Sequence, residues 1–201
     1  FERALKMFRK GRHPGGAEIA LLNLAECHLK LKDYQKAKRY AYEAIEAAKE
    51  GRAWGTHAYQ VLAEIDLAQD YNQQALEYLE KSLEIAQKRE MGREPMIFLL
   101  MGKCLHRLSR PQEALDHFLL ALDHCSGQGN KFFLPDCHYE LSEFYKAQGN
   151  FQKALEHFTA FYKAKETILQ DAADYKRNAL EVFYHTESLK HDMEFQEKQN
   201  L

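Results

Sequence analysis

Apolar residues recur every three or four positions along most of this chain, which is the spacing of one buried face of an α-helix. The apolar segments come in pairs, and short polar turns such as Lys32-Asp33-Tyr34, Ser109-Arg110-Pro111 and Gly149-Asn150 join the members of a pair. No segment has the strict apolar–polar alternation of a half-buried strand. The pattern therefore predicts an all-α chain built from antiparallel helical hairpins.

The paired segments divide the chain into a half repeat followed by four hairpins. We predict the second helix of a repeat over residues 1–13, and hairpins over about 17–51, 54–91, 94–126 and 132–169. This array covers residues 1–170. Residues 171–200 contain neither glycine nor proline, so 171–201 is predicted to form a separate C-terminal helix.

A short sequence recurs in the second helix of every unit. Ala154-Leu155-Glu156-His157-Phe158 is nearly copied at Ala114-Leu115-Asp116-His117-Phe118, and weaker copies begin at Ala4, Ala37 and Ala75. The leading alanines are 33, 38, 39 and 40 residues apart. In each hairpin a small residue lies twelve positions before the alanine, namely Ala25, Ala63, Gly102 and Ser142. Two small residues in constant register indicate helices that cross closely in stacked, repeated units.

These positions resemble the tetratricopeptide repeat, whose first helix reads roughly W-x2-L-G-x2-Y and whose second reads A-x3-F. The first-helix motif occurs as Leu21-x2-Leu24-Ala25-x2-His28, Tyr59-x2-Leu62-Ala63-x2-Asp66, Phe98-x2-Met101-Gly102-x2-Leu105 and His138-x2-Leu141-Ser142-x2-Tyr145. The chain departs from the family because the closing proline is absent, His28 and Asp66 replace an aromatic residue, and the step is 38 to 40 residues. The longer step is similar to that of bacterial regulatory and scaffold proteins. The resemblance covers residues 1–169 and implies a right-handed superhelix whose first helices line a concave groove.

In the family's geometry, the groove-facing residues lie one, five and eight positions after the opening core residue of each first helix. The resemblance thereby implies a groove lined by Leu22, Glu26, Leu29, Gln60, Glu64, Leu67, Leu99, Lys103, His106, Tyr139, Glu143 and Lys146. Three of the four middle positions are glutamate, and leucines flank the first two. This chemistry favours a protein or peptide segment with apolar anchors and basic residues. The alternatives are ordinary solvated glutamates on a helix face, or a receptor for a small signalling ligand with a pocket formed by Lys103, His106 and Tyr139.

The C-terminal segment has its own periodicity. In one heptad register the a positions are Ala172, Ala179, Thr186, Met193 and Asn200, and the d positions are Tyr175, Val182, Leu189 and Gln196. Its first half also contains Leu180, Phe183 and Tyr184, so we expect it to cap the exposed end of the last hairpin. Its second half narrows to a thin apolar seam, which favours a coiled-coil stalk and a homodimer through Val182, Leu189 and Met193. The alternative is a plain solubilising cap helix with a frayed end. This segment also resembles the connector that links such repeats to a GGDEF or kinase output domain in bacterial signalling proteins.

Composition and charge exclude several classes of function. The formal net charge is −2, so the chain lacks the overall basic field needed to bind nucleic acid or an anionic membrane. No apolar run approaches the ~20 residues of a membrane-spanning helix, and the N-terminus is amphipathic and unlike a signal peptide. Because the chain begins without methionine, we interpret it as a piece of a longer protein. The scattered cysteines Cys27, Cys104, Cys125 and Cys137 suit a reducing, cytoplasmic location.

No catalytic motif is present in the sequence. It lacks a glycine-rich phosphate loop, H-E-x-x-H and G-x-S-x-G. The best candidate for a metal site is His124-Cys125 with Cys137-His138, but adjacent helical residues point about 100° apart, so each pair offers one easy ligand. We therefore predict no cofactor, no metal and no enzymatic activity. The predicted function is a binding module that acts as a scaffold or as the sensory domain of a larger signalling protein.

Overall fold

The structure, a computed structural model, describes residues 1–11, 14–48, 55–88, 95–126 and 131–199. For Pro14, Ser126 and residues 191–199 the description extends to the backbone only. The predicted unit boundaries at residues 13, 51, 54, 91 and 94, and the predicted C-terminal end at 201, lie outside these residues.

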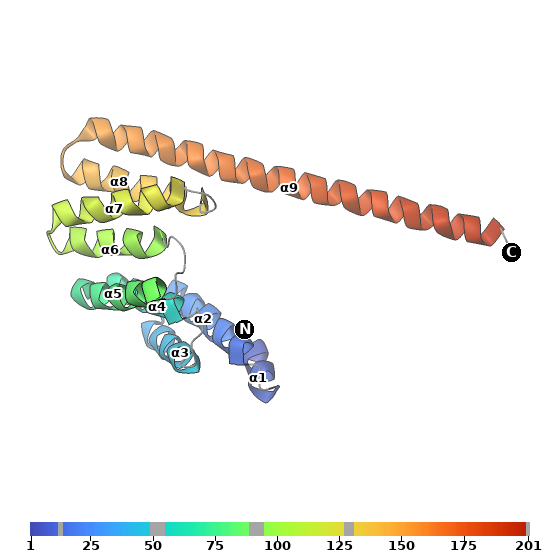
Figure 1. The fold of residues 1–201 in the computed structure, drawn as a ribbon, viewed down its shortest axis with the longest axis horizontal. Helices are drawn as coiled ribbons and strands as arrows, with labels where there is room; N and C mark the ends of the chain where they lie inside the picture. Colours follow the sequence, from blue (N-terminus) through green and yellow to red (C-terminus); the bar gives the residue numbers. More distant parts are fainter. Residues whose placement is uncertain (12–13, 49–54, 89–94, 127–130, 200–201) are drawn as a thin grey trace.

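All regular elements in the described part of the chain are helices (Figure 1). Helix α1 (Glu2–Lys10) is followed by four antiparallel hairpins stacked in chain order, and each hairpin contacts the next. This confirms the predicted all-α solenoid with a long C-terminal helix. The hairpins are α2 (Pro14–Lys30) with α3 (Tyr34–Ala47), α4 (Gly55–Ala68) with α5 (Asn72–Lys88), α6 (Pro95–Arg107) with α7 (Pro111–Ser126), and α8 (Leu134–Ala147) with α9 (Phe151–Gln199); the 3₁₀ turn η1 (Lys131–Phe133) precedes α8.

Every hairpin turn ends its first helix in the same way. The residue five positions before the repeat alanine has a positive φ, with values of 60° at Lys32, 62° at Asp70, 58° at Ser109 and 72° at Gly149. In the third turn, for example, the Ser109 N–H donates to the His106 carbonyl at 3.1 Å, and the Arg110 N–H donates to the Leu105 carbonyl at 2.9 Å. This pair of bonds is a Schellman cap, which satisfies carbonyls left free at the helix end.

The small residues of the motif lie where the two helices of a hairpin cross. A Cβ on Gly102 would lie 2.6 Å from the ring of Phe118, so no larger residue fits there without a shift of that ring. The buried hydroxyl of Ser142 donates to the Ala154 carbonyl at 2.9 Å. The twelve-residue register between small residue and alanine is thus a packing contact between the two helices.

A buried ion pair accounts for one departure from the family's motif. Asp66 occupies a position where the family has an aromatic residue, and its side chain is only 1% exposed. The Lys38 ammonium from α3 lies against this carboxylate and also 5.6 Å from the ring centroid of Tyr71. Because a buried carboxylate is costly without a partner, Lys38 and Asp66 act as one unit between the first and second hairpins.

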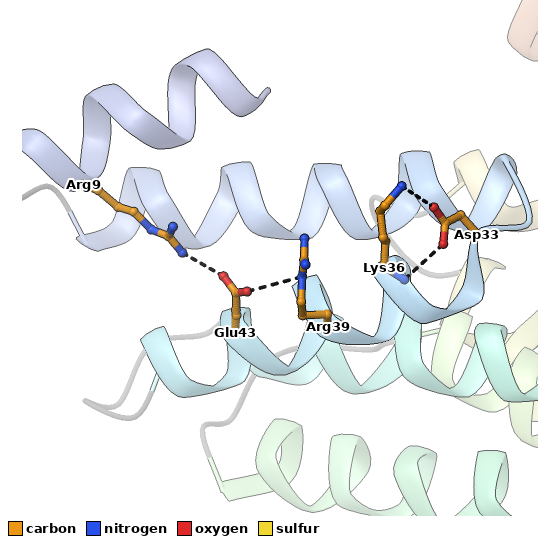
Figure 2. A network of polar contacts seen from close by, with 5 residues as sticks. All are labelled: Arg9, Asp33, Lys36, Arg39 and Glu43. Carbon is orange, nitrogen blue, oxygen red and sulfur yellow. Dashed lines mark hydrogen bonds and ion pairs between the residues drawn. The ribbon is translucent and has the colours of Figure 1, made fainter.

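Helix α1 packs on the first hairpin through buried Leu5, and exposed ion pairs border this contact (Figure 2). Arg9 reaches across to Glu43 on α3 at 2.7 Å, and Arg39 approaches the same carboxylate at 3.7 Å. At the start of α3, Asp33 accepts the Lys36 N–H at 3.3 Å and pairs with the Lys36 ammonium at 2.8 Å. Exposed pairs of this kind contribute little to stability, so apolar contacts hold α1 on the hairpin, chiefly those of buried Leu5 and of the Phe8 ring beside Gly16.

The C-terminal helix differs from the prediction. There is no break near residue 170, because α9 is one helix of 49 residues that packs on α8 and then continues beyond the stack (Figure 1). Leu180, Phe183 and Tyr184, which were expected to cover the last hairpin, are exposed. The structure therefore contradicts the capping interpretation. A continuous helix cannot fold back over the end of the hairpin from which it emerges, and this stretch contains no glycine or proline to break it.

Candidate functional site

The first helices of the hairpins form a continuous wall. Helix α2 contacts α4, α4 contacts α6, and α6 contacts α8, in addition to the contacts within each hairpin. The middle positions predicted to face the groove are half-buried at Glu26, Glu64 and Lys103, whereas Glu143 is exposed on the last helix. We call the partly exposed face that these residues mark the groove wall. Its side chains come from four helices that are far apart in sequence.

Four of the predicted groove residues are not available to a partner. Leu22, Gln60, Leu67 and Leu99 are each at most 5% exposed, so their assignment to the groove surface is wrong in this structure. The reason is that successive first helices pack side by side, and each helix buries the flanking positions of its neighbour. The wall is consequently narrower and more polar than the sequence pattern predicts.

The remaining predicted residues keep some exposure. Leu29 is half-buried beside Glu26, and the His106 ring packs edge-on against Phe144 with centroids 5.3 Å apart. Exposed Tyr139 lies against Phe161 at 5.5 Å, and Lys146 pairs with Glu143 at 3.3 Å. On the last hairpin these positions are open because, in the described chain, no further first helix packs on α8.

Two residues that the sequence analysis missed complete the polar contacts of the wall. The Glu26 carboxylate lies 2.7 Å from the His57 ring nitrogen, and the Lys103 ammonium donates to Glu140 at 2.8 Å. A signal for both was present, because His57 lies seven residues before Glu64 and Glu140 lies three before Glu143, which are spacings that share a helix face. These contacts join α2 to α4 and α6 to α8.

Glu64 lies between these two pairs and differs from them. Burial raises the pKa of its carboxyl above the ordinary value, and the neighbouring Glu26 charge acts in the same direction; His57, Lys103 and Lys30 act against it. No ion pair or hydrogen bond joins the Glu64 side chain to another described residue. A half-buried carboxylate with a raised pKa and no direct cationic partner is a place where an added positive charge would be stabilised.

Each residue of the alternative small-ligand pocket already contacts another side chain. Lys103 is paired with Glu140, His106 packs on Phe144, and Tyr139 packs on Phe161 from the neighbouring α9. Each side chain is thus engaged by a different neighbour. The described contacts favour the groove wall over this pocket.

The four candidate metal residues do not come together as one group. The Cys125 and Cys137 sulfurs approach to 3.5 Å, but the His124 ring packs edge-on against Phe98 and the His138 ring turns toward His157, with their Nδ1 atoms 3.0 Å apart. Within the described residues no group of three or more potential metal ligands is found. The separation follows from the helix geometry, which points adjacent residues in different directions.

The second half of α9 presents a different kind of surface. The face of α9 that contacts α8 includes Ala154, His157 and Phe161. The same three-four spacing continues at partly buried Ala164 and Ile168 and then at Ala172, Tyr175, Ala179, Val182, Thr186 and Leu189. We call residues 169–199 the rod. Val182 is 66% exposed and Leu189 50%, while the side chain of Met193 lies outside the described residues. Among the described helices, none is both long enough and apolar enough to cross a membrane.

Comparisons with known proteins agree on the fold. Residues 16–88 match the tetratricopeptide repeat family, whereas no curated protein matches the chain. Among solved structures, BtubC from P. vanneervenii has 17% identity, covers 83% of this chain and 89% of that chain, and has a TM-score of 0.54. MamA 41-end from Desulfovibrio magneticus RS-1 has 17% identity, 83% and 86% coverage, and a TM-score of 0.57. Aspartyl phosphate phosphatase F from Bacillus subtilis has 17% identity, 75% and 40% coverage, and a TM-score of 0.65.

Proposed function

We propose that this chain is a non-catalytic module that binds a protein or peptide segment along the groove wall. The support is that residues 16–88 match the tetratricopeptide repeat family and that the stacked hairpins have a fold similar to that of solved structures such as MamA. Repeats of this fold generally serve as interaction modules for protein partners. The observation that carries the proposal is Glu64, a half-buried carboxylate in the middle of the wall that has no direct cationic partner among the described residues.

The contacts beside Glu64 limit what the partner can be. Glu26 is already engaged by His57, and Lys103 is engaged by Glu140, so neither needs a partner to be satisfied. Glu64 is the position at which a lysine or arginine of the partner forms a new ion pair in a partly desolvated place. Half-buried Leu29 offers a nearby apolar contact on α2. The proposed partner is therefore a segment with one buried basic residue and an adjacent apolar anchor.

A substitution that removes only the charge tests this proposal. The probe is a displayed peptide library in which one fixed lysine or arginine is flanked by random apolar residues, selected on the wild-type chain. Glu64→Gln is expected to weaken the selected peptides at least about tenfold, since a charge-assisted contact in a partly buried site is worth about 1.5–3 kcal/mol. The matched control is Glu77→Gln, an exposed position on the outer helix α5, which should bind as the wild type does.

Two outcomes would contradict the groove assignment. One is a selection that yields peptides whose affinity does not change with Glu64→Gln. The other is a library that yields no binder at all above the background of the immobilised control. Circular dichroism of both variants checks that the helical content is unchanged, so a loss of affinity reports the site and not the fold.

We further propose that the rod pairs with the rod of a second copy and transmits occupancy of the groove to an attached output domain. The support is the apolar stripe, which continues from the face that packs on α8 through Val182 and Leu189 without a partner in the described chain. Thin stripes of this spacing are typical of helices that pair in coiled coils. Binding in the groove would change the stacking of the hairpins, and the continuous α9 would carry that change along roughly 45 Å of helix.

Light scattering after size exclusion tests the pairing. We expect the wild-type chain to be dimeric at high protein concentration and Val182→Asp to be monomeric, because a charge in the seam opposes pairing. Ser188→Asp adds the same charge on the opposite side of the rod and should remain dimeric. A monomeric wild type, or equal dissociation of the two variants, would reject pairing through this stripe.

A further inference from the structure

A pair of buried thiols lies at the junction between the third and fourth hairpins. Cys125 is in the last turn of α7 and Cys137 is in the first half of α8, and both are free cysteines with fully buried side chains. Their sulfurs are 3.5 Å apart, which is hydrogen-bonding distance for thiols. The two residues are twelve positions apart in the chain but belong to different hairpins, so their contact crosses a joint of the solenoid.

The surroundings make the two thiols unequal. The hydrogen bond between the two sulfurs lowers the pKa of Cys125, whereas the same bond and burial both raise the pKa of Cys137. Cys125 is therefore the better nucleophile, since the thiolate is the reactive form. A disulfide requires the sulfurs to close from 3.5 Å to about 2.05 Å, a change of the size that side-chain rotation and a small helix shift supply.

We propose that Cys125 and Cys137 are a modification site at which a small peroxide forms a reversible intramolecular disulfide, which covalently links α7 to α8. In the first step the Cys125 sulfur attacks one oxygen of hydrogen peroxide, the O–O bond breaks, and water leaves with formation of a sulfenic acid. In the second step the Cys137 sulfur attacks the Cys125 sulfur, the S–O bond breaks, and a second water leaves. The two thiols lose two electrons and two protons, and one peroxide becomes two waters.

A disulfide at this position would also affect the shape of the groove wall. Helix α8 supplies Glu140, which pairs with Lys103 on α6, and the α7–α8 contact sets how the fourth hairpin sits on the third. A covalent link across this joint would hold that arrangement and restrict changes in the curvature of the wall. Burial of both sulfurs admits a small oxidant during brief local opening and disfavours bulky thiol reagents or a second protein.

The other cysteines provide controls. Cys27 is exposed on α2 and could form disulfides between molecules, so the experiment uses the full chain with Cys27→Ser. After treatment with hydrogen peroxide, the protein is denatured, its free thiols are alkylated, and the intact mass and peptides are measured. We expect alkylated thiols to fall from three to one, a peptide joining Cys125 to Cys137, and full recovery of three thiols with dithiothreitol. The unfolding temperature should rise on oxidation and return on reduction, because the link constrains the unfolded chain.

Further variants distinguish a Cys125–Cys137 disulfide from oxidation of single cysteines. Cys104→Ser should still form the link, although Cys104 belongs to the same hydrophobic core cluster as the pair. Cys137→Ser should lose it and should instead accumulate over-oxidised Cys125, since no resolving thiol remains. The proposal is overturned if three thiols are still alkylated after peroxide, if the link involves Cys104, or if over-oxidation occurs without any link. These readouts do not depend on the groove partner, so they stand apart from the tests of the proposed function.

Discussion

The two halves of α9 have the same pattern of apolar positions, but the apolar face of the first half packs on another helix and that of the second half is exposed to solvent. Over the first part of the helix the stripe that includes Ala154, His157 and Phe161 packs on α8, whereas over the rod the continuation of that stripe at Val182 and Leu189 is exposed. The helix itself does not change between the two halves. The comparison shows that apolar periodicity specifies a helix and the face it can bury, while burial depends on whether a second element lies opposite.

The largest expected contrast comes from removing one phenylalanine from each region. Phe118, 1% exposed, fills the hairpin crossing beside Gly102, and Phe183 on the rod is 57% exposed. We expect Phe118→Ala to lower the free energy of unfolding by about 3–5 kcal/mol and Phe183→Ala to change it by less than about 0.5 kcal/mol. Urea unfolding followed by circular dichroism measures both. Similar losses for the two variants would show that the rod is packed in solution.

A change in pH should affect the packed half of α9 and spare the rod. The pKa values of His138 and His157 are both lowered, chiefly by burial between α8 and α9, and for His138 also by the charge of His157. Their neutral forms are thus favoured in the folded state, so their contribution to stability is complete above about pH 6.5, the ordinary histidine pKa. It is lost as the pH falls below that value, because protonation then favours the unfolded chain.

Unfolding temperatures measured between pH 8 and pH 5 check this expectation. The double variant His138→Gln with His157→Gln should show a shallower decrease on acidification than the wild type does. His185→Gln replaces an exposed histidine of the rod and should leave the curve unchanged. Identical pH curves for the double variant and the wild type would exclude the histidine pair as the acid-sensitive contact.

The smallest expected effects come from replacing serine by glycine, which should stabilise the chain at a hairpin turn and destabilise the helix in the rod. Ser109 has a φ of 58° at its hairpin turn, a conformation that costs a non-glycine residue about 1 kcal/mol, so Ser109→Gly should stabilise the chain by up to that amount. Ser188→Gly lies within the rod helix and should weaken the helix by roughly 0.5 kcal/mol. Thermal unfolding measures the first variant, and loss of far-ultraviolet helical signal on heating measures the second. A destabilising Ser109→Gly would mean that the serine side chain contributes more to the turn than its strain costs.

The internal repeat predicted most of the solenoid because it records local packing. Gly102 and Ala114 are small for the reason inferred from their register, which is that a larger side chain would collide at the crossing of two helices. The three turns named from the sequence, at Lys32, Ser109 and Gly149, do join paired helices, whereas the turn at Asp70 was not singled out; only Gly149 among these four positions is a glycine. The groove was harder to predict, since Leu67 and Leu99 have the same helical positions as exposed wall residues and are buried by the neighbouring hairpin.

The sequence by itself determined the helices, their pairing into hairpins and the residues at which paired helices cross, because each of these follows from a spacing of apolar and small residues that recurs in every unit. Only the tertiary structure decided which charges of the wall are already paired, that Glu64 has no direct cation within the described part of the chain, and that Cys125 meets Cys137. It also decided that α9 continues as a rod and does not cap the stack. The physical reason is that exposure and partnership are properties of neighbouring surfaces, and a periodic pattern describes only one of the two surfaces in a contact.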